Sequence, residues 1–181
     1  MKKIILVNPD FSSPVRNGPK PSSPSVAARW SPFKEVMVPL GLATVAALTP
    51  EDVEVDIWDE AIDGPINAGT QFKKEYALAG ITGYINHAGR VKELGQIFRQ
   101  RRMLTAVGGP GVSSEPELFR DSFDILFIGE AEYSWPRFVA DWRAGHHVET
   151  YRQVSRVDMA HTPPPDWNRV KVDAPALRAR G

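Results

Sequence analysis

Five short apolar runs alternate with stretches of helical periodicity, and this alternation constrains the fold of the chain more than any other feature. Four of the runs are nearly continuous in apolar residues, as parallel strands buried on both faces usually are. The run at 53–59 alternates apolar and polar residues instead, which predicts an edge strand. The predicted strands are residues 3–9, 53–59, 76–84, 103–110 and 124–130.

The stretches between these runs carry helix signals. The segment 39–50 begins and ends at a proline, and the segment 131–145 has an aromatic stripe and stops at Gly145. The predicted helices are residues 39–50, 87–102, 113–121 and 131–145. Strands that alternate with helices predict an α/β doubly wound fold, here with a five-stranded parallel sheet.

Two stretches do not fit this pattern. Residues 10–33 are a long loop dense in Pro, Ser and Gly, and a loop of this length is usually functional or disordered. Residues 148–181 contain the sequence HTPPPDW, which is typical of an extended linker. We therefore expect a domain at 1–147 followed by a C-terminal extension at 148–181.

Composition narrows the function classes. The chain has no cysteine, which excludes disulfides, a thiolate nucleophile and an iron–sulfur cluster bound by this chain alone. Basic and acidic residues number 22 each, so net charge gives no reason to expect nucleic acid or an anionic membrane as a partner. No apolar run is long enough to span a bilayer. The default expectation is a cytoplasmic protein.

In open α/β sheets, ligands bind outside the carboxyl ends of the strands. The residues expected there are mostly small, with few side chains suited to acid–base catalysis, so we assign no catalytic residue. This composition favours holding a large ligand. The residues are Asn8, Pro9, Asp10, Thr82, Gly83, Tyr84, Ile85, Asn86, Gly108, Gly109, Pro110, Gly111, Gly129 and Glu130.

Common nucleotide motifs are missing from these positions. The first strand is followed by VNPDFSS rather than G-x-G-x-x-G, and the chain has no phosphate-binding G-x-x-x-x-G-K-[ST] loop. A flavin site stays open as an alternative, because Ser12 and Ser13 could bind the phosphate of FMN. A further alternative is an interaction domain with an empty site.

Several stretches together resemble the N-terminal cobalamin (vitamin B12)-binding domain of B12-dependent radical S-adenosylmethionine enzymes. They are ILVNP, VPLGLATVAAL, AGITGY, VGGPGVSSEPE and FIGEAEYSWPRFV, in this order within residues 3–145. The resemblance implies a flavodoxin-like, Rossmann-like fold. It also implies that the nucleotide tail of cobalamin runs beside the sheet and that the corrin lies across the strand ends.

The resemblance assigns roles to particular residues. Gly108 and Gly109 would line the channel for the nucleotide tail, and the Thr82 hydroxyl would bond to that tail. Pro110, Gly111 and Val112 would form part of the rim under the corrin. Gly129, Glu130 and Glu132 would close the opposite wall.

The cobalt would lack a histidine from a D-x-H-x-x-G motif, because NPDFSSPVRNG stands where other B12 proteins have it. The resemblance thus implies base-off, His-off binding, with His87 and Tyr84 as weaker candidates for the lower face of the cobalt. We therefore assign no residue as the metal ligand.

The expected function is a cofactor-binding module, non-catalytic alone, of a radical S-adenosylmethionine enzyme, most commonly a methyltransferase in this family. The full enzyme would also use S-adenosylmethionine and a [4Fe-4S] cluster. The Pro-rich tail and the final Arg-Gly pair resemble the connector before the catalytic domain, so we expect that domain on the same, longer chain.

Overall fold

The computed structural model describes residues 2–10 and 38–171. The described residues form a six-stranded parallel sheet with strand order β2-β1-β3-β4-β5-β6. This is the doubly wound α/β arrangement that the sequence predicts, and β2 lies at an edge as expected. The strands are β1 (Lys3–Asn8), β2 (Glu54–Asp59), β3 (Leu78–Thr82), β4 (Leu104–Gly108), β5 (Ile125–Ile128) and β6 (Thr150–Arg152).

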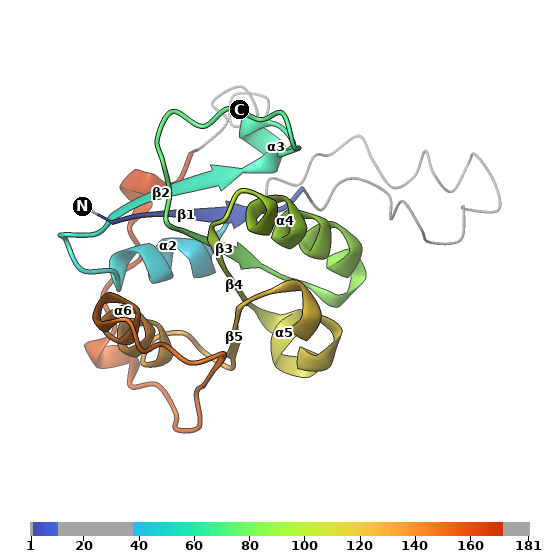
Figure 1. The fold of residues 1–181 in the computed structure, drawn as a ribbon. Helices are drawn as coiled ribbons and strands as arrows, with labels where there is room; N and C mark the ends of the chain where they lie inside the picture. Colours follow the sequence, from blue (N-terminus) through green and yellow to red (C-terminus); the bar gives the residue numbers. More distant parts are fainter. Residues whose placement is uncertain (1, 11–37, 172–181) are drawn as a thin grey trace, which may run out of the picture.

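The helices cover both faces of the sheet, with α2 and α6 on one side and α4 and α5 on the other (Figure 1). None of the helices in the described part of the chain is long and apolar enough to cross a membrane. The helices are α2 (Leu40–Ala47), α3 (Glu60–Asp63), α4 (Ala88–Gln100), α5 (Pro110–Ser114) and α6 (Ser134–Ala144), with 3-10 turns η1 (Ile85–His87), η2 (Pro116–Leu118), η3 (Arg120–Ser122), η4 (Met159–His161) and η5 (Trp167–Arg169).

Each face of the sheet has its own hydrophobic core. Alternate residues of a strand point to opposite faces, so Leu6 packs under α2 and α6 while Val7 packs under α4. The α6 core is rich in aromatic rings: Phe127 lies 5.4 Å from both Trp135 and Phe138, measured between ring centroids. The predicted aromatic stripe on residues 131–145 is confirmed as core packing.

The strand count predicted from the sequence is one too low. The sixth strand, β6, is only three residues long and has a single buried apolar residue, Tyr151, so it produces no apolar run. Its position depends on tertiary contacts. The Tyr151 ring stacks on Phe127 at 5.5 Å, and its hydroxyl bonds to Asp141 of α6 at 2.9 Å.

The tail predicted as an extended linker packs on the domain over its described part. The Asp166 N–H donates to the Ala43 carbonyl of α2 at 3.0 Å, and Arg169 donates to the Val55 carbonyl of β2. Val170 packs against the core under α2. These contacts join the tail to α2 and β2. The predicted loop 10–33, including Ser12 and Ser13, lies outside the described residues except for Asp10.

The helix predicted at 113–121 is replaced by α5 and two 3-10 turns. Glu115 adopts an extended φ of −134°, since the proline that follows disfavours the helical conformation there. The helix observed here, α5, begins earlier than predicted, at Pro110, because proline suits the first position of a helix.

Asp124 stabilises the junction between β4 and β5. Its carboxylate accepts hydrogen bonds from the Thr105 N–H and hydroxyl at 2.8 and 2.7 Å and from Arg99 at 2.8 Å. Burial opposes ionisation of Asp124, but these hydrogen bonds outweigh it and lower its pKa below the ordinary 3.8. A carboxyl group whose pKa is lower in the folded protein than in the unfolded chain stabilises the fold at pH values above its unfolded-state pKa. The stabilisation by Asp124 therefore disappears as the pH falls through its folded-state pKa.

We expect Asp124→Asn to lower the free energy of unfolding by about 1.5–3 kcal/mol at neutral pH, since it removes hydrogen bonds to a charged group. The difference from the parent protein should vanish in acid, below the folded-state pKa of Asp124. Urea denaturation at several pH values from neutral to acid measures the free energy of unfolding of both proteins. Asp121→Asn, at an exposed neighbouring position, is the control, and an equal effect there would contradict the assignment.

Candidate functional site: a cavity at the carboxyl edge of the sheet

A cavity of about 250 Å³ lies between the sheet and the helices α2 and α6. It starts at the carboxyl ends of β3, β4 and β5 and continues inward along the face of the sheet. This is the edge at which open α/β sheets bind ligands. The residues lining it are Leu6, Gly41, Leu42, Thr44, Val45, Gly80, Ile81, Thr82, Ala106, Val107, Gly108, Gly109, Phe127, Gly129, Glu130, Ala131, Glu132 and Trp135.

The cavity exists because small residues occupy one face of two neighbouring strands. Gly80 pairs with Ala106, and Thr82 pairs with Gly108, so all four point toward α2 and α6. A side chain at Gly108 would start 3.2 Å from Phe127 Cβ. Large residues at these positions would fill the space between the sheet and the helices.

Helix α2 forms the wall opposite the sheet. Gly41, Thr44 and Val45 lie three and four residues apart, which places them on one face of the helix, and all three line the cavity. The Thr44 hydroxyl donates to the Leu40 carbonyl at 3.1 Å. Apart from its own helix turn, no described residue has a heavy atom within 4 Å of the point where a Cβ on Gly41 would stand. The wall at Gly41 is therefore open.

Two glycines at strand ends have backbone conformations that favour glycine. Gly109 has φ +114° and Gly129 has φ +87°. A Cβ on Gly109 would lie 3.0 Å from both the Gly83 carbonyl oxygen and the Thr82 hydroxyl oxygen. A hydrogen bond joins the ends of β3 and β4, since the Gly83 N–H donates to the Gly108 carbonyl at 2.8 Å. Gly108 and Gly109 thus allow the turn after β4 and also line the cavity.

The structure brings six of the sequence-predicted site residues to the cavity: Thr82, Gly108, Gly109, Gly129, Glu130 and Glu132. Among the described residues, the two glutamates are the only titratable side chains that line it. Glu130 is exposed and Glu132 half-buried, so both carboxylates lie toward the mouth. Because the rest of the described lining carries no titratable side chain, it is suited to recognising a ligand by its shape.

The other predicted site residues lie outside the cavity lining. Val112 is fully buried in the core under α4, and Gly111 packs so closely on the turn after β3 that a Cβ would lie 2.6 Å from the Ile85 nitrogen. Both have a clear packing role. The complete set outside the lining is Asn8, Pro9, Gly83, Tyr84, Ile85, Asn86, Pro110, Gly111 and Val112.

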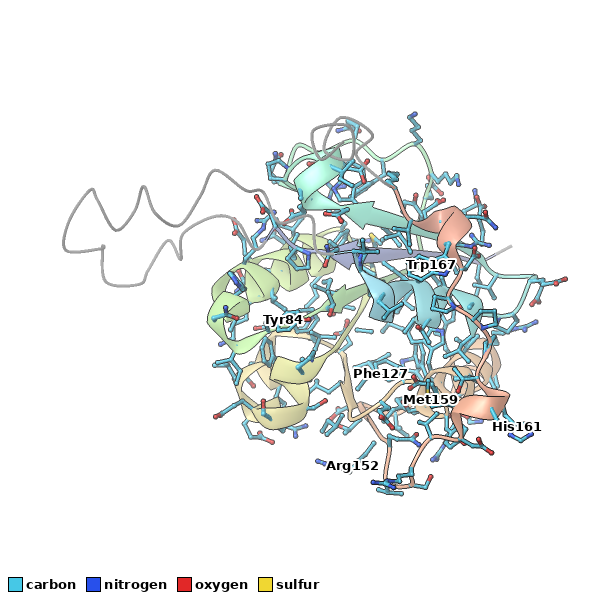
Figure 2. All side chains as sticks on the ribbon, turned by 180° about the vertical axis from the view of Figure 1, so that it is seen from behind. Tyr84, Phe127, Arg152, Met159, His161 and Trp167 are labelled. Atoms are coloured by element: carbon cyan, nitrogen blue, oxygen red, sulfur yellow. The ribbon has the colours of Figure 1, made fainter. Side chains whose placement is uncertain are left out.

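Tyr84 and His87 lie at the end of β3, on the side of α4 and α5, and Tyr84 is labelled there in Figure 2. The His87 N–H donates to the Tyr84 carbonyl at 3.2 Å, closing the turn before α4. Partial burial lowers the pKa of His87, opposed by the charge of Asp10. His87 is thus favoured as a neutral imidazole, the form that can ligate a metal. No group of three potential metal-ligating residues occurs in the described ranges.

A second polar cluster fixes the carboxyl ends of β1 and β2. Asn8 donates to Asp59 at 3.1 Å, and desolvation raises the pKa of Asp59 in spite of that bond and one from the Ala61 N–H. The neighbouring Glu60 side chain is completely buried and pairs with Arg90. Asn8 therefore has a structural partner of its own.

Sequence reasoning missed the inner and helical walls of the cavity. The sequence does contain a signal for Gly80 and Ala106. Alternate residues of a strand point to the same face of the sheet, and these two lie two residues before the predicted rim residues Thr82 and Gly108. No local signal identifies Gly41, Thr44 and Val45, since their role depends on where α2 packs across the sheet. Trp135 and Phe127 serve both the core and the cavity wall.

The fold and cavity define a parallel α/β domain with a cavity at its strand ends, and comparison with known proteins adds a relationship. No model of a known protein family matches the chain. An uncharacterized methyltransferase from a Synechocystis species is 26% identical over 142 residues, which are 78% of this chain and 26% of that protein.

The bacteriochlorophyllide d C-8(2)-methyltransferase of Chlorobaculum tepidum is 28% identical over 125 residues, 69% of this chain and 26% of that enzyme. The similarity to this chain thus spans about a quarter of the length of each relative. Among solved structures, the N-terminal domain of a hypothetical protein from Thermotoga maritima is 21% identical, with a TM-score of 0.38, covering 49% of this chain and 73% of that one. The two sequence comparisons show that the chain is weakly similar to methyltransferases.

Proposed function

We propose that this chain binds cobalamin, base-off and without a histidine ligand, for a radical S-adenosylmethionine methyltransferase. The observation that carries the proposal is the cavity between β3, β4 and the helices α2 and α6, lined by Gly80, Ala106 and Gly108. The weak similarity to two methyltransferases agrees with it. The ordered set of motifs that resembles the B12-binding domain supplies the identity of the ligand.

The size and shape of the cavity fit part of such a cofactor. Pockets that enclose a whole drug-sized ligand hold roughly 300–1,000 Å³. The 250 Å³ here is below that range, so it suits the nucleotide tail of a larger molecule. The backbone at Gly108, Gly109 and Gly129 can approach the tail closely, because no side chain intervenes.

The chain's own residues would hold the cofactor and exclude water from its tail. Bound methylcobalamin supplies a transferable methyl group. The Thr82 hydroxyl lines the cavity and has no hydrogen bond within the described part of the chain, so it can bond to the tail. S-adenosylmethionine and the [4Fe-4S] cluster would bind to a catalytic domain, since this chain has no cysteine to ligate a cluster.

The spectrum of the protein after exposure to the cofactor tests the proposal. The protein is incubated with hydroxocobalamin, desalted and measured in the visible range, with a parallel sample incubated with FMN. We expect corrin bands in near-stoichiometric amount and no flavin bands. A yellow FMN-loaded protein would favour the flavin alternative, and a protein colourless in both samples would defeat cofactor binding.

A further inference from the structure

The inner wall of the cavity is apolar. Leu6, Phe127 and Trp135 are at most 5% exposed and lie beside Gly80 and Ala106, two residues below the rim formed by Thr82 and Gly108. The mouth, in contrast, has exposed backbone and the carboxylate of Glu130. Polarity therefore decreases from the mouth to the inner end.

The Trp135 indole at the inner end and the Thr44 hydroxyl on the α2 wall already donate hydrogen bonds within the protein. The Trp135 indole N–H donates to the Thr49 hydroxyl at 2.9 Å, and the Thr44 hydroxyl donates to the Leu40 carbonyl at 3.1 Å. Among the described residues that line the cavity, Thr82 is the one whose hydroxyl makes no hydrogen bond to the protein. Past Glu130 and Glu132 at the mouth, a group that enters the cavity thus meets the available Thr82 hydroxyl and a mainly apolar wall.

We infer that the cavity selects its cobamide by the lower base, taking a benzimidazole and discriminating against a purine. This inference rests on the proposed function. A benzimidazole base released from cobalt has one free ring nitrogen, which Thr82 can bond, and otherwise a hydrocarbon surface. An adenine base has further ring nitrogens and an amino group, and each would lose its water without gaining a partner against the apolar wall.

Binding measurements with three corrinoids test the selectivity. They are cobalamin, the cobamide with an adenine base, and cobinamide, which lacks the nucleotide; binding is followed by quenching of tryptophan fluorescence and by the corrinoid spectrum. We expect cobalamin to bind about 10- to 100-fold more tightly than the adenine cobamide, the range over which an apolar pocket discriminates. Cobinamide should also bind more weakly than cobalamin.

Failure of the inference and failure of the proposed function give different results. Equal affinity for the two cobamides would overturn the selectivity and leave cobalamin binding intact. Cobinamide binding as tightly as cobalamin would overturn it as well, because the nucleotide would then lie outside the cavity. No binding of any of the three corrinoids would defeat the proposed function and the inference together.

Two variants of similar shape test the role of Thr82. Thr82→Val removes the available hydroxyl and should weaken cobalamin binding by about tenfold, while cobinamide binding stays unchanged. Thr150→Val makes the same substitution in β6, at a half-buried position outside the cavity lining, so it is the control and should change cobalamin affinity less than about threefold. An equal loss in both variants, or an equal loss for cobinamide, would overturn the assignment of Thr82.

Discussion

Replacing Gly41 by tryptophan is expected to abolish retention of cobalamin while leaving the fold intact. Gly41 lines the cavity on the same face of α2 as Thr44 and Val45, and among the described residues outside its own helix turn no atom lies within 4 Å of an added Cβ. An indole at this position would occupy the space proposed for the nucleotide tail. Helix propensity also improves when an ordinary residue replaces glycine, which protects the fold.

The loss should be at least about 100-fold in affinity, equivalent to about 2.8 kcal/mol of tail contacts that can no longer form. Desalting after incubation with hydroxocobalamin gives the first measurement, and a fluorescence titration gives the dissociation constant. Circular dichroism and urea denaturation check that the variant is folded.

Ala140→Trp is the control, because it adds the same side chain at an exposed position on α6 outside the cavity lining. This variant should retain cobalamin as the parent protein does. Gly109 is less suitable for the test, since its φ of +114° would strain any side chain whether or not a ligand binds. Full affinity in Gly41→Trp would show that the tail does not use this cavity.

The fold was predictable to the extent that it depends on local patterns. Continuous apolar runs identified β1, β3, β4 and β5, and the alternation in 53–59 identified an edge strand, because burial on one or two faces leaves a direct trace in the sequence. Strand β6 left no such trace. Tyr151 contributes to the core through rings that lie far from it in the sequence, at Phe127 and Phe138.

The site was predictable at the rim and not within the cavity. Thr82, Gly108 and Gly129 stand at strand ends, and strand ends in a parallel sheet share one edge. The depth of the cavity depends on the lack of a large side chain at Gly80 and Ala106 and on the packing of α2. A glycine inside an apolar run has several explanations, so only the paired register of β3 and β4 shows that these two residues lie together.

Replacing Glu60 by glutamine is expected to destabilise the fold strongly. The Glu60 side chain is completely buried and pairs with Arg90, whose Nε lies 3.1 Å from Glu60 Oε2. The same carboxylate accepts hydrogen bonds from the backbone N–H groups of Ile66 at 2.7 Å and Asp10 at 3.1 Å. One carboxylate therefore joins α4, the loop after α3 and the end of β1.

Removing one partner of a buried ion pair typically costs about 3–5 kcal/mol, because the remaining charge stays buried without compensation. Arg90 is 22% exposed and keeps Glu93 at 2.8 Å as a second partner, so we expect the lower part of this range for Glu60→Gln. The free energy of unfolding from urea denaturation measures the loss.

Glu93→Gln is the matched control, because it removes the half-exposed partner of the same arginine. Exposed ion pairs contribute about 0–1 kcal/mol, so Glu93→Gln should have a small effect. Equal effects of the two substitutions would mean that burial of Glu60 does not govern the strength of the pair. A large loss confined to Glu60→Gln would show that this carboxylate holds together the edge of the sheet where β1 ends.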